Sequence, residues 1–394
     1  MSSVTEKSRD AHPVPAMSGT DPSACASRRH IPTPALVCDF DLLLDNIDRM
    51  AALALAAGVG VRPHVKSHKS ATIARLQLDS GAVGLACAKL AEAEVLVKRL
   101  RDDGYRPPLS ILLTSPLAGP DAARRAALLS AQCELLTVVD HPDGVRELAR
   151  ASHETGTEFT VLCDVDVGLG RTGVVGASEA LRVVEQVVNS PTLTFGGVQG
   201  YGGHLQHVVG FTRRRDQTRT SSQRLGTVTD ALEARGYAVA LRTGGGTGTC
   251  AIDVEIGLLN ELQPGSYVFM DRQYRDALGD DPGGAFHQSL VVATTVLSVN
   301  QIGFVTVDAG LKSMATDAGR PLVLGHETTV LYDFFGDEHG RISSDVDGPF
   351  ERGQRFDLVP PHCDPTVDRY DVIWLVRDDL VVGIADVVAR GRSQ

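Results

Sequence analysis

The 394-residue chain has no run of apolar residues approaching the ~18 that a membrane-spanning helix needs. It also lacks an excess of positive charge, because 38 Lys and Arg residues stand against 49 Asp and Glu residues and the formal net charge is −11. A negative balance of this size argues against binding nucleic acid through a basic surface. We therefore expect a protein that binds neither a membrane nor a nucleic acid.

Paired cysteines are missing as well. The seven cysteines are an odd number, they are scattered through apolar segments, and no two of them have Cys-x-x-Cys spacing. This arrangement predicts reduced, buried thiols in a cytoplasmic protein rather than a disulfide framework. Residues 1–28 are rich in Ser, Pro and charge and lack the apolar core of a secretion signal, so we expect them to form a tail.

A regular alternation of β-prone and helical segments follows this tail. Apolar and β-branched runs alternate with stretches in which apolar residues recur at helical spacing. The repeated strand–helix unit is typical of an α/β fold of the (β/α)₈ TIM-barrel type, and a doubly wound open sheet is the alternative. The expected strands cover residues 33–39, 61–66, 84–87, 109–113, 135–139, 159–165, 193–200 and 238–242. The expected helices cover residues 41–57, 70–79, 90–100, 120–131, 142–154, 177–189 and 215–235.

The helical spacing stops after about residue 275. Short β-prone runs parted by Gly, Asp and Pro turns take its place, which predicts a separate all-β domain. These runs cover residues 289–299, 303–307, 328–332, 355–359, 372–376 and 380–385. The predicted division of the chain is therefore a tail at 1–28, a barrel at 29–274 and a β domain at 275–394.

Basic residues gather in residues 62–69, which we expect to enter a buried barrel strand. Burying a cation without a partner costs about several kcal/mol. Because strand side chains alternate, His64, Lys66 and His68 would share one face. One interpretation is an edge strand with solvated cations. The other is a lysine neutralised as a Schiff base with a carbonyl group, which is how pyridoxal phosphate is held. Lys66 is the better candidate than Lys69, because it faces the same way as the histidines.

Arg171 is the first of several candidate residues that follow other predicted strands. In a TIM barrel, the groups at the carboxyl ends of the strands form the active site. Arg171 lies in a Gly-rich turn behind Asp164 and Asp166. It can hold an anionic oxygen, or it can be a loop arginine in a salt bridge to one of these acids.

Residues 199–207 end the next strand and contain both glycines and proton-transfer groups. The glycines let the backbone turn close to a ligand. Tyr201, His204 and His207 can donate, accept or transfer protons. A single histidine is more often structural, but two histidines in one Gly-rich strand end favour a functional role.

The loop Thr243-Gly244-Gly245-Gly246-Thr247 also follows a strand. Successive N–H groups of such a loop form an anion-binding nest, and the two threonine hydroxyls add donors. The loop lacks the lysine of a nucleotide-binding P-loop. In barrels, phosphate sites commonly lie in the late strand loops, so we predict a phosphate site here, with a flexible tight turn as the alternative.

His362 and Asp364 lie two residues apart in the predicted β domain. On an extended strand their side chains would point the same way, with Cys363 pointing opposite. One imidazole and one carboxylate with open positions make a two-ligand metal site completed by water or substrate. A carboxylate favours a harder ion such as Mn²⁺, with Zn²⁺ or Mg²⁺ as alternatives. The competing interpretation is two exposed polar residues at a turn.

Taken together, these motifs resemble the fold-type III pyridoxal-phosphate enzymes, specifically the D-threonine aldolase and D-serine dehydratase group. The likeness runs from about Thr33 to Gly391. It is carried by the segments 62–69, 166–173, 243–248, 261–271, 308–313 and 361–366 in this order.

The resemblance implies a role for each candidate at the cofactor. Lys66 would carry pyridoxal 5'-phosphate as the internal aldimine, and Arg171 would contact the phenolic oxygen of the cofactor. The loop 244–247 would hold the phosphate. Tyr201 would lie beside the cofactor ring.

The resemblance also implies a divalent metal on His362 and Asp364 and a homodimeric assembly whose site is completed by the β domain. His207 would be the catalytic base. The additional His204 departs from the family pattern, so the choice between His204 and His207 stays open at this point.

The activity implied is retro-aldol cleavage of a D-3-hydroxy amino acid of the D-threonine type to glycine and an aldehyde. Asp364 at the second metal position resembles the aldolase branch, because dehydratases of this group tend to carry Cys there. The alternatives are a D-3-hydroxyaspartate aldolase and a dehydratase that converts D-serine or D-3-hydroxyaspartate to a 2-oxo acid and ammonia. A non-enzymatic pyridoxal-phosphate carrier would lack the β domain and the metal pair, and a metal-dependent hydrolase would be colourless.

Overall fold

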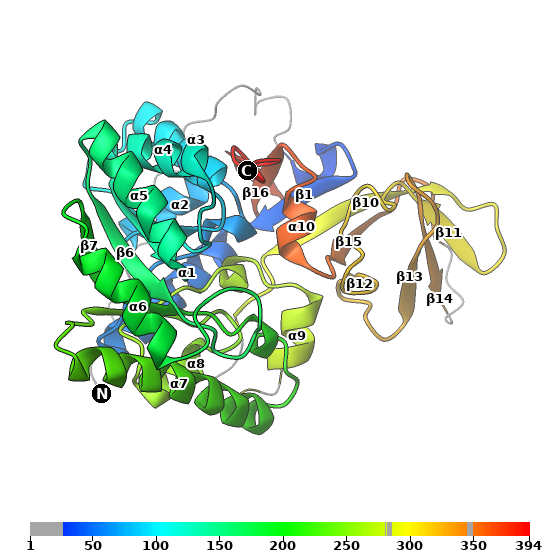
Figure 1. The fold of residues 1–394 in the computed structure, drawn as a ribbon. Coiled ribbons are helices and arrows are strands. Elements are labelled where there is room, and N and C mark those ends of the chain that lie inside the picture. The colour runs from blue at the N-terminus through cyan, green and yellow to red at the C-terminus, as the bar shows by residue number, and fades with distance from the viewer. Residues whose placement is uncertain (1–26, 280, 282–285, 345–349) are drawn as a thin grey trace, which may run out of the picture.

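Two β-sheets organise the protein. The computed structural model describes residues 27–279, 281, 286–344 and 350–394. An eight-stranded parallel sheet forms the larger part, and a nine-stranded sheet projects to one side of it (Figure 1). The predicted tail at 1–28 lies outside the described residues except for Ser27 and Arg28, which contact Leu380 and Asp357 of the second sheet.

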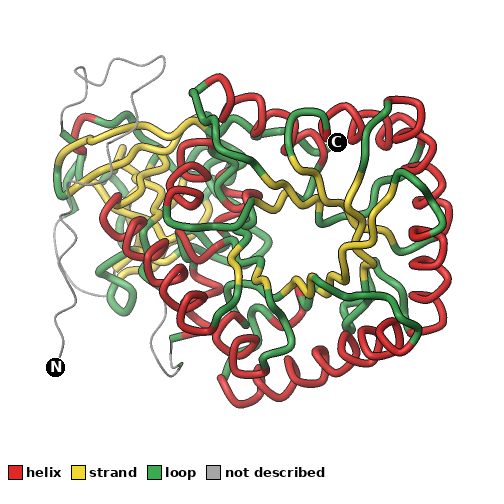
Figure 2. Tube along the Cα trace, turned by 90° about the vertical axis from the view of Figure 1, so that its left-hand side faces the viewer, coloured by secondary structure: helices red, strands yellow, loops and turns green. Residues whose placement is uncertain are grey.

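The first sheet is a barrel with strand order β2-β9-β8-β7-β6-β5-β4-β3. Its two edges meet, because Val83 N donates to Val61 O and His64 bridges Ala86. Seen end-on, the strands form a ring surrounded by helices (Figure 2). The strands are β2 (Gly60–Val61), β3 (Leu85–Cys87), β4 (Ser110–Leu113), β5 (Glu134–Val139), β6 (Phe159–Asp164), β7 (Leu193–Gly200), β8 (Leu241–Gly244) and β9 (Glu261–Leu262). The predicted TIM-barrel class is confirmed, and the open sheet is not formed.

Helices cover the outside of this barrel (Figure 2). They form where apolar residues recur at helical spacing, so that one face of each packs on the strands. The helices are α1 (Phe40–Ala57), α2 (Ala71–Asp79), α3 (Leu90–Asp102), α4 (Pro120–Ser130), α5 (Pro142–Thr155), α6 (Ala177–Val188), α7 (Phe211–Ala234), α8 (Cys250–Ile256) and α9 (Arg272–Leu278). No helix of the described segments has the length and hydropathy of a membrane-crossing segment.

The second sheet has the order β13-β14-β11-β10-β1-β16-β17, with β15 paired to β10 and β12 paired to β15. The connection between its strands β15 and β16 forms the short helix α10 (Cys363–Val367). Its strands are β1 (Ala35–Asp39), β10 (Leu290–Ser298), β11 (Phe304–Val307), β12 (Leu322–Val323), β13 (Val330–Phe334), β14 (Gly340–Ser344), β15 (Arg355–Val359), β16 (Val372–Arg377) and β17 (Leu380–Asp386). The predicted C-terminal β domain is therefore present, and the domain boundaries stay a prediction.

The prediction that residues 33–39 form the first barrel strand is wrong. Strand β1 runs antiparallel to β10 and parallel to β16 in the second sheet. Leu36 and Val37 are both buried, on opposite faces and in different apolar clusters. A run that is apolar on both faces is compatible with either sheet, so its composition does not select one. The eighth barrel position belongs to the two-residue strand β9, which is too short to show periodicity.

The six cysteines within the described segments are all free and buried, as predicted. Burial raises the pKa of thiols such as Cys38 to about 12, so these groups are neutral and unreactive. Cys25, the seventh, lies outside the described residues.

Lys69 joins the barrel to the second sheet through two carboxylates. Its Nζ lies 3.2 Å from Glu92 of α3 and 2.7 Å from Asp368 behind α10, and its side chain is 10% exposed. Its backbone has a positive φ of 52°, and its carbonyl accepts from Ala389 N near the carboxyl end of the chain. Lys69 is thus committed to a structural ion cluster, which leaves Lys66 as the cofactor candidate.

We expect Lys69→Met to lower the free energy of unfolding by about 3 kcal/mol, because it leaves the buried Glu92 carboxylate without its cation. Urea unfolding followed by circular dichroism measures this. The double variant Lys69→Met/Glu92→Gln removes the orphaned charge and should recover part of the loss. A single-variant loss below about 0.5 kcal/mol would contradict the structural role.

Candidate active site

Lys66 lies in a 3-10 turn at the carboxyl end of β2. The prediction of a strand over 61–66 is wrong beyond Val61: His64 still pairs with Ala86 as an isolated bridge, but Val65–Ser67 leaves the sheet. The chain instead forms the turn Val65–Ser67. The Lys66 side chain is 39% exposed, although its neighbours in sequence are buried. The turn therefore presents one amine above the barrel.

The two flanking histidines do not share a strand face with Lys66. His64 Nδ1 accepts from Lys66 N at 3.4 Å, so its Nε2–H donates to Thr114 Oγ1 at 3.1 Å. His68 Nδ1 accepts from Ser70 N, and its Nε2–H donates to Gln77 Oε1 at 3.2 Å. Both ring nitrogens of each histidine are hydrogen-bonded, so the two buried rings hold the turn in place.

Both rings are neutral. Burial, aided by the Lys66 ammonium, lowers the pKa of His64 to about 3. Burial likewise lowers the pKa of His68 to about 4. The buried stretch around Lys66 therefore does not accumulate charge.

Asp364 is the ion-pair partner of Lys66. Asp364 Oδ2 lies 3.2 Å from Lys66 Nζ, and Oδ1 accepts from Ser266 Oγ at 3.2 Å. Burial opposes ionisation of this carboxyl, but the Lys66 ammonium and His362 hold the pKa of Asp364 well below its ordinary value. In return, Asp364 raises the pKa of Lys66. An amine of the barrel and a carboxylate of the second sheet thus meet at one site.

His362 and Asp364 lie in a helical turn rather than on a strand, so the predicted extended geometry is wrong. His362 is the N-cap of α10 and Asp364 lies in its first turn. Pro365 lies in the first turn of α10, where a proline removes no helical hydrogen bond. Asp271 anchors the turn on the barrel, since its Oδ2 accepts from Cys363 N at 2.9 Å. Asp364 is nevertheless brought to the Lys66 amine, and His362 lies two residues before it at the start of the same helical turn.

No cluster of three or more His, Cys, Asp or Glu side chains suited to a metal occurs within the described segments. If His362 and Asp364 bind a metal ion, its further ligands would be water or substrate. His362 Nδ1 lies 2.7 Å from Asp317 Oδ2.

The structure brings His207, and not His204, to this site. The His207 ring centroid lies 4.4 Å from that of Tyr274 and 6.5 Å from that of His362. Burial, with His362 nearby, lowers the pKa of His207 to about 4, and its buried Nε2 has no hydrogen-bond partner in the described part of the chain. His204 is exposed and lies beside Gly168.

Arg171 packs over Tyr201, with its guanidinium carbon 5.4 Å from the ring centroid. The alternative of a salt bridge from Arg171 to the nearby acids is not formed among the described residues. Asp164 instead accepts from Thr172 Oγ1 at 2.8 Å, and Asp166 accepts from the backbone of its own loop. Arg171 and Tyr201 are thus a paired cation and ring.

The Gly-rich loop after β8 is folded tightly against the end of β7. Gly244, Gly245 and Gly246 allow close approaches, because a Cβ atom on each would lie 2.1–2.5 Å from Gly200 O, Asp253 Oδ2 and Gln206 Oε1 respectively. Thr247 Oγ1 accepts from Tyr267 N at 3.0 Å. These contacts hold the loop in a narrow backbone turn.

The Thr243 hydroxyl is engaged by polar side chains inside the barrel. It donates to Glu261 Oε1 at 2.8 Å and accepts from Gln263 Nε2 at 2.9 Å. Glu261 also pairs with Arg62 Nε at 2.9 Å. Thr243 therefore belongs to a buried polar network inside the barrel rather than to the anion nest.

Gln206 and Asp271 were not predicted as site residues. Gln206 Oε1 accepts from Gly248 N at 2.9 Å, and its Nε2 donates to Gly202 O at 3.1 Å, so it ties the Gly-rich loop to the end of β7. The available signals were the adjacency of Gln206 to His207 and the position of Asp271 at the end of segment 261–271, which carries the family resemblance.

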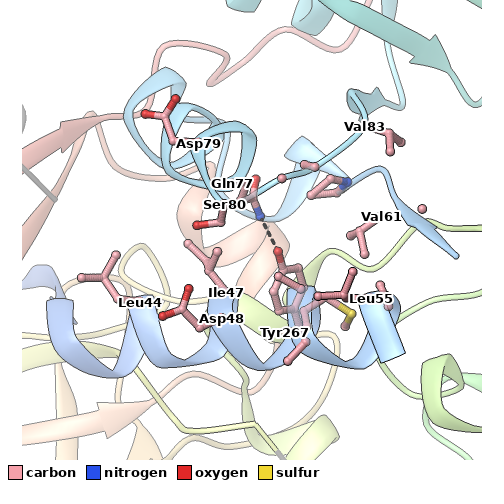
Figure 3. A pocket seen from close by; sticks show the side chains of 18 of the residues that line it. Leu44, Ile47, Asp48, Leu55, Val61, Gln77, Asp79, Ser80, Val83 and Tyr267 are labelled. Atoms are coloured by element: carbon pink, nitrogen blue, oxygen red, sulfur yellow. Dashed lines mark hydrogen bonds between the residues drawn. The ribbon is translucent and has the colours of Figure 1, made fainter. Parts of the chain in front are cut away.

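A cavity of about 890 Å³ lies elsewhere, between α1 and α2 (Figure 3). Its floor includes Tyr267, whose hydroxyl accepts from Gln77 Nε2 at 3.0 Å. Lys66, His207 and His362 do not line it. The cavity is therefore separate from the Lys66–Asp364 pair.

Comparison with known proteins agrees with this geometry. Residues 38–273 match the family model for the alanine racemase N-terminal domain, and residues 289–376 match that for a putative serine dehydratase domain. The chain is 35% identical over 386 residues to a 3-hydroxy-D-aspartate aldolase of Paracoccus denitrificans, with 96% of each chain covered. It is also 35% identical over 386 residues to a D-threonine aldolase of Arthrobacter sp., with 98% of each covered.

A solved structure shows the same fold. The crystal structure of D-threonine aldolase from Filomicrobium marinum superimposes with a TM-score of 0.88 at 33% identity, covering 94% of this chain and 98% of that one. The Lys66 turn, the paired Arg171 and Tyr201, and the His362–Asp364 turn therefore lie in a fold shared with aldolases along nearly the whole length. The chain belongs to the alanine-racemase-like family of lyases that contains D-threonine aldolase and 3-hydroxy-D-aspartate aldolase.

Proposed function

We propose that the protein cleaves the Cα–Cβ bond of a D-3-hydroxy amino acid of the D-threonine type and releases glycine and an aldehyde. The observation that carries this proposal is the 3.2 Å approach of Lys66 Nζ to Asp364 Oδ2. It places an amine able to hold an aldehyde cofactor beside a carboxylate able to hold a cation. The aldolase relatives support the same reaction.

The residues around Lys66 fit pyridoxal 5'-phosphate. The amine is accessible, and Arg171 over Tyr201 offers a cation and an aromatic face. The narrow turn 244–247 would hold the phosphate, since its three glycines leave the backbone open to close approach of an anion. When bound, the cofactor supplies an acceptor for the electron pair released as the Cα–Cβ bond breaks.

His362 and Asp364 fit a divalent cation, because an imidazole and an ionised carboxylate lie together and leave positions for substrate. We propose Mn²⁺, with Zn²⁺ or Mg²⁺ as alternatives. Such an ion would supply positive charge that favours ionisation of the substrate β-hydroxyl.

His207 is the proposed general base. Its pKa is lowered to about 4 by burial, so the ring is neutral near neutral pH and can accept a proton. Its Nε2 has no partner in the described part of the chain, which is the state required of an atom that takes the β-hydroxyl proton. Tyr274 packs against the ring, with the two ring centroids 4.4 Å apart.

Product analysis tests the reaction. Purified protein supplied with pyridoxal 5'-phosphate and Mn²⁺ is incubated with D-threonine, D-3-hydroxyaspartate and D-serine in turn. We expect glycine with acetaldehyde or glyoxylate from the first two substrates. Formation of a 2-oxo acid and ammonia instead would identify a dehydratase and refute the aldolase proposal.

We further propose a cytoplasmic homodimer. Six buried, free cysteines suit a reducing compartment. Leu331, Phe335 and Ile302 leave apolar surface on the second sheet that a second copy can cover. Size-exclusion chromatography with light scattering measures the molar mass of the purified protein. The mass of a single chain at micromolar concentration would refute the dimer.

We expect Lys66→Ala to bind Mn²⁺ about tenfold more tightly than the wild type when both lack the cofactor. The free Lys66 ammonium competes with the cation for Asp364, and the substitution removes the competitor. Calorimetric titration after chelator treatment measures this. Lys312→Ala, which removes an exposed lysine paired with Glu338, serves as the control. Equal affinities would contradict the competition.

A further inference from the structure

Asp317 contacts a proposed metal ligand from a distant part of the chain. Its Oδ2 lies 2.7 Å from His362 Nδ1 across 45 residues of sequence. An ionised carboxylate only accepts hydrogen bonds, so Nδ1 carries the hydrogen and donates it to Asp317. In the neutral ring, the lone pair is then on Nε2.

The loop that carries Asp317 is attached to α10 by other residues. Ala315 N donates to Thr366 Oγ1 at 3.0 Å, and Tyr370 Oη donates to Ser313 O at 2.9 Å. Thr366 Oγ1 in turn donates to His362 O at 2.7 Å. The Asp317 carboxylate is therefore positioned by the backbone of its loop, and its side chain is left to contact His362.

This contact has little value for folding. The Asp317 side chain is 55% exposed and that of His362 is 25% exposed. Exposed pairs of this kind contribute at most about 1 kcal/mol to stability. A function at the His362 ring is the more consistent explanation.

We propose that Asp317 is a positioning residue that holds His362 in the tautomer and orientation offering Nε2 to the divalent cation. The inference rests on the proposed metal site. A histidine ligand whose second nitrogen donates to a carboxylate is more basic and is already oriented, and loss of such a partner typically costs about 10–100-fold in metal affinity.

The test is a titration of Mn²⁺ into chelator-treated, cofactor-loaded protein, with free Mn²⁺ followed by electron paramagnetic resonance. Asp317→Ala should raise the Kd about 10–100-fold, and Asp317→Asn, which keeps an acceptor oxygen, should raise it less. The cofactor absorbance and the melting temperature should match those of the wild type. Activity of Asp317→Ala should return at saturating Mn²⁺, which a misfolded protein would not show.

Two controls separate the possible failures. Asp337→Asn alters another exposed acid of the same sheet and should leave the Kd unchanged. His362→Ala tests the metal site itself. If His362→Ala raises the Kd for Mn²⁺ but Asp317→Ala leaves it within about twofold of the wild type, the role of Asp317 alone is overturned. A Kd insensitive to His362→Ala would overturn the metal site, and the role of Asp317 with it.

Discussion

Lys66→Ala is expected to abolish the visible absorbance of the cofactor-loaded protein and to reduce lyase turnover by at least about 10⁴-fold. Among the described residues, Lys66 is the amine that pairs with Asp364, so the variant leaves the cofactor without its proposed covalent anchor. Absorbance spectra of dialysed protein and glycine release from D-threonine measure the two effects.

The lysine controls make this result specific. Lys69→Met should keep the colour, because Lys69 is engaged by Glu92 and Asp368. Lys98→Ala, at an exposed ion pair on α3, should resemble the wild type in both measurements. If Lys66→Ala stayed coloured after dialysis and kept its turnover, the assignment of the cofactor to this turn would be refuted.

His207→Ala should lower turnover by about 10²–10⁴-fold, equivalent to a barrier increase of about 3–5 kcal/mol, while cofactor absorbance stays unchanged. The reason is the loss of the unpartnered Nε2 beside His362, which is proposed to accept the β-hydroxyl proton. Steady-state kinetics at saturating Mn²⁺ measure the loss in kcat.

His204→Ala is the matched comparison, since His204 is the other histidine of the same strand end and is exposed. It should retain turnover within a few-fold of the wild type. A fall of less than about tenfold in His207→Ala would exclude the general-base role. A large fall in His204→Ala with little effect at His207 would reverse the assignment.

Much of the architecture was predictable because it depends on local periodicity. Alternating strand and helix patterns predicted the barrel, and each barrel helix arises where its own residues supply an apolar face. The error at 33–39 has a physical cause, since Leu36 and Val37 are buried on opposite faces and such a strand suits either sheet. Strand β9 could not be predicted in this way, because two residues are too few to show an alternating pattern.

The site residues were predictable as chemical types but not as geometry. Lys66, Arg171, Tyr201 and His207 follow strands whose carboxyl ends meet at one end of the barrel. Whether each side chain faces the site depends on turns set by tertiary contacts, as for Thr243, which turns inward to Glu261.

By itself, the sequence determined the fold class and the family, and it named the candidate site residues. The fold class is recorded in residue type and spacing, because those properties decide which segments become helices or strands. Only the tertiary structure decided which side chains these residues contact. Lys66 meets Asp364, and His362 meets Asp317, through contacts between segments far apart in the chain. The first contact arises from packing of the barrel against the second sheet, and the second from packing of two connections of the second sheet against each other, neither of which local spacing encodes.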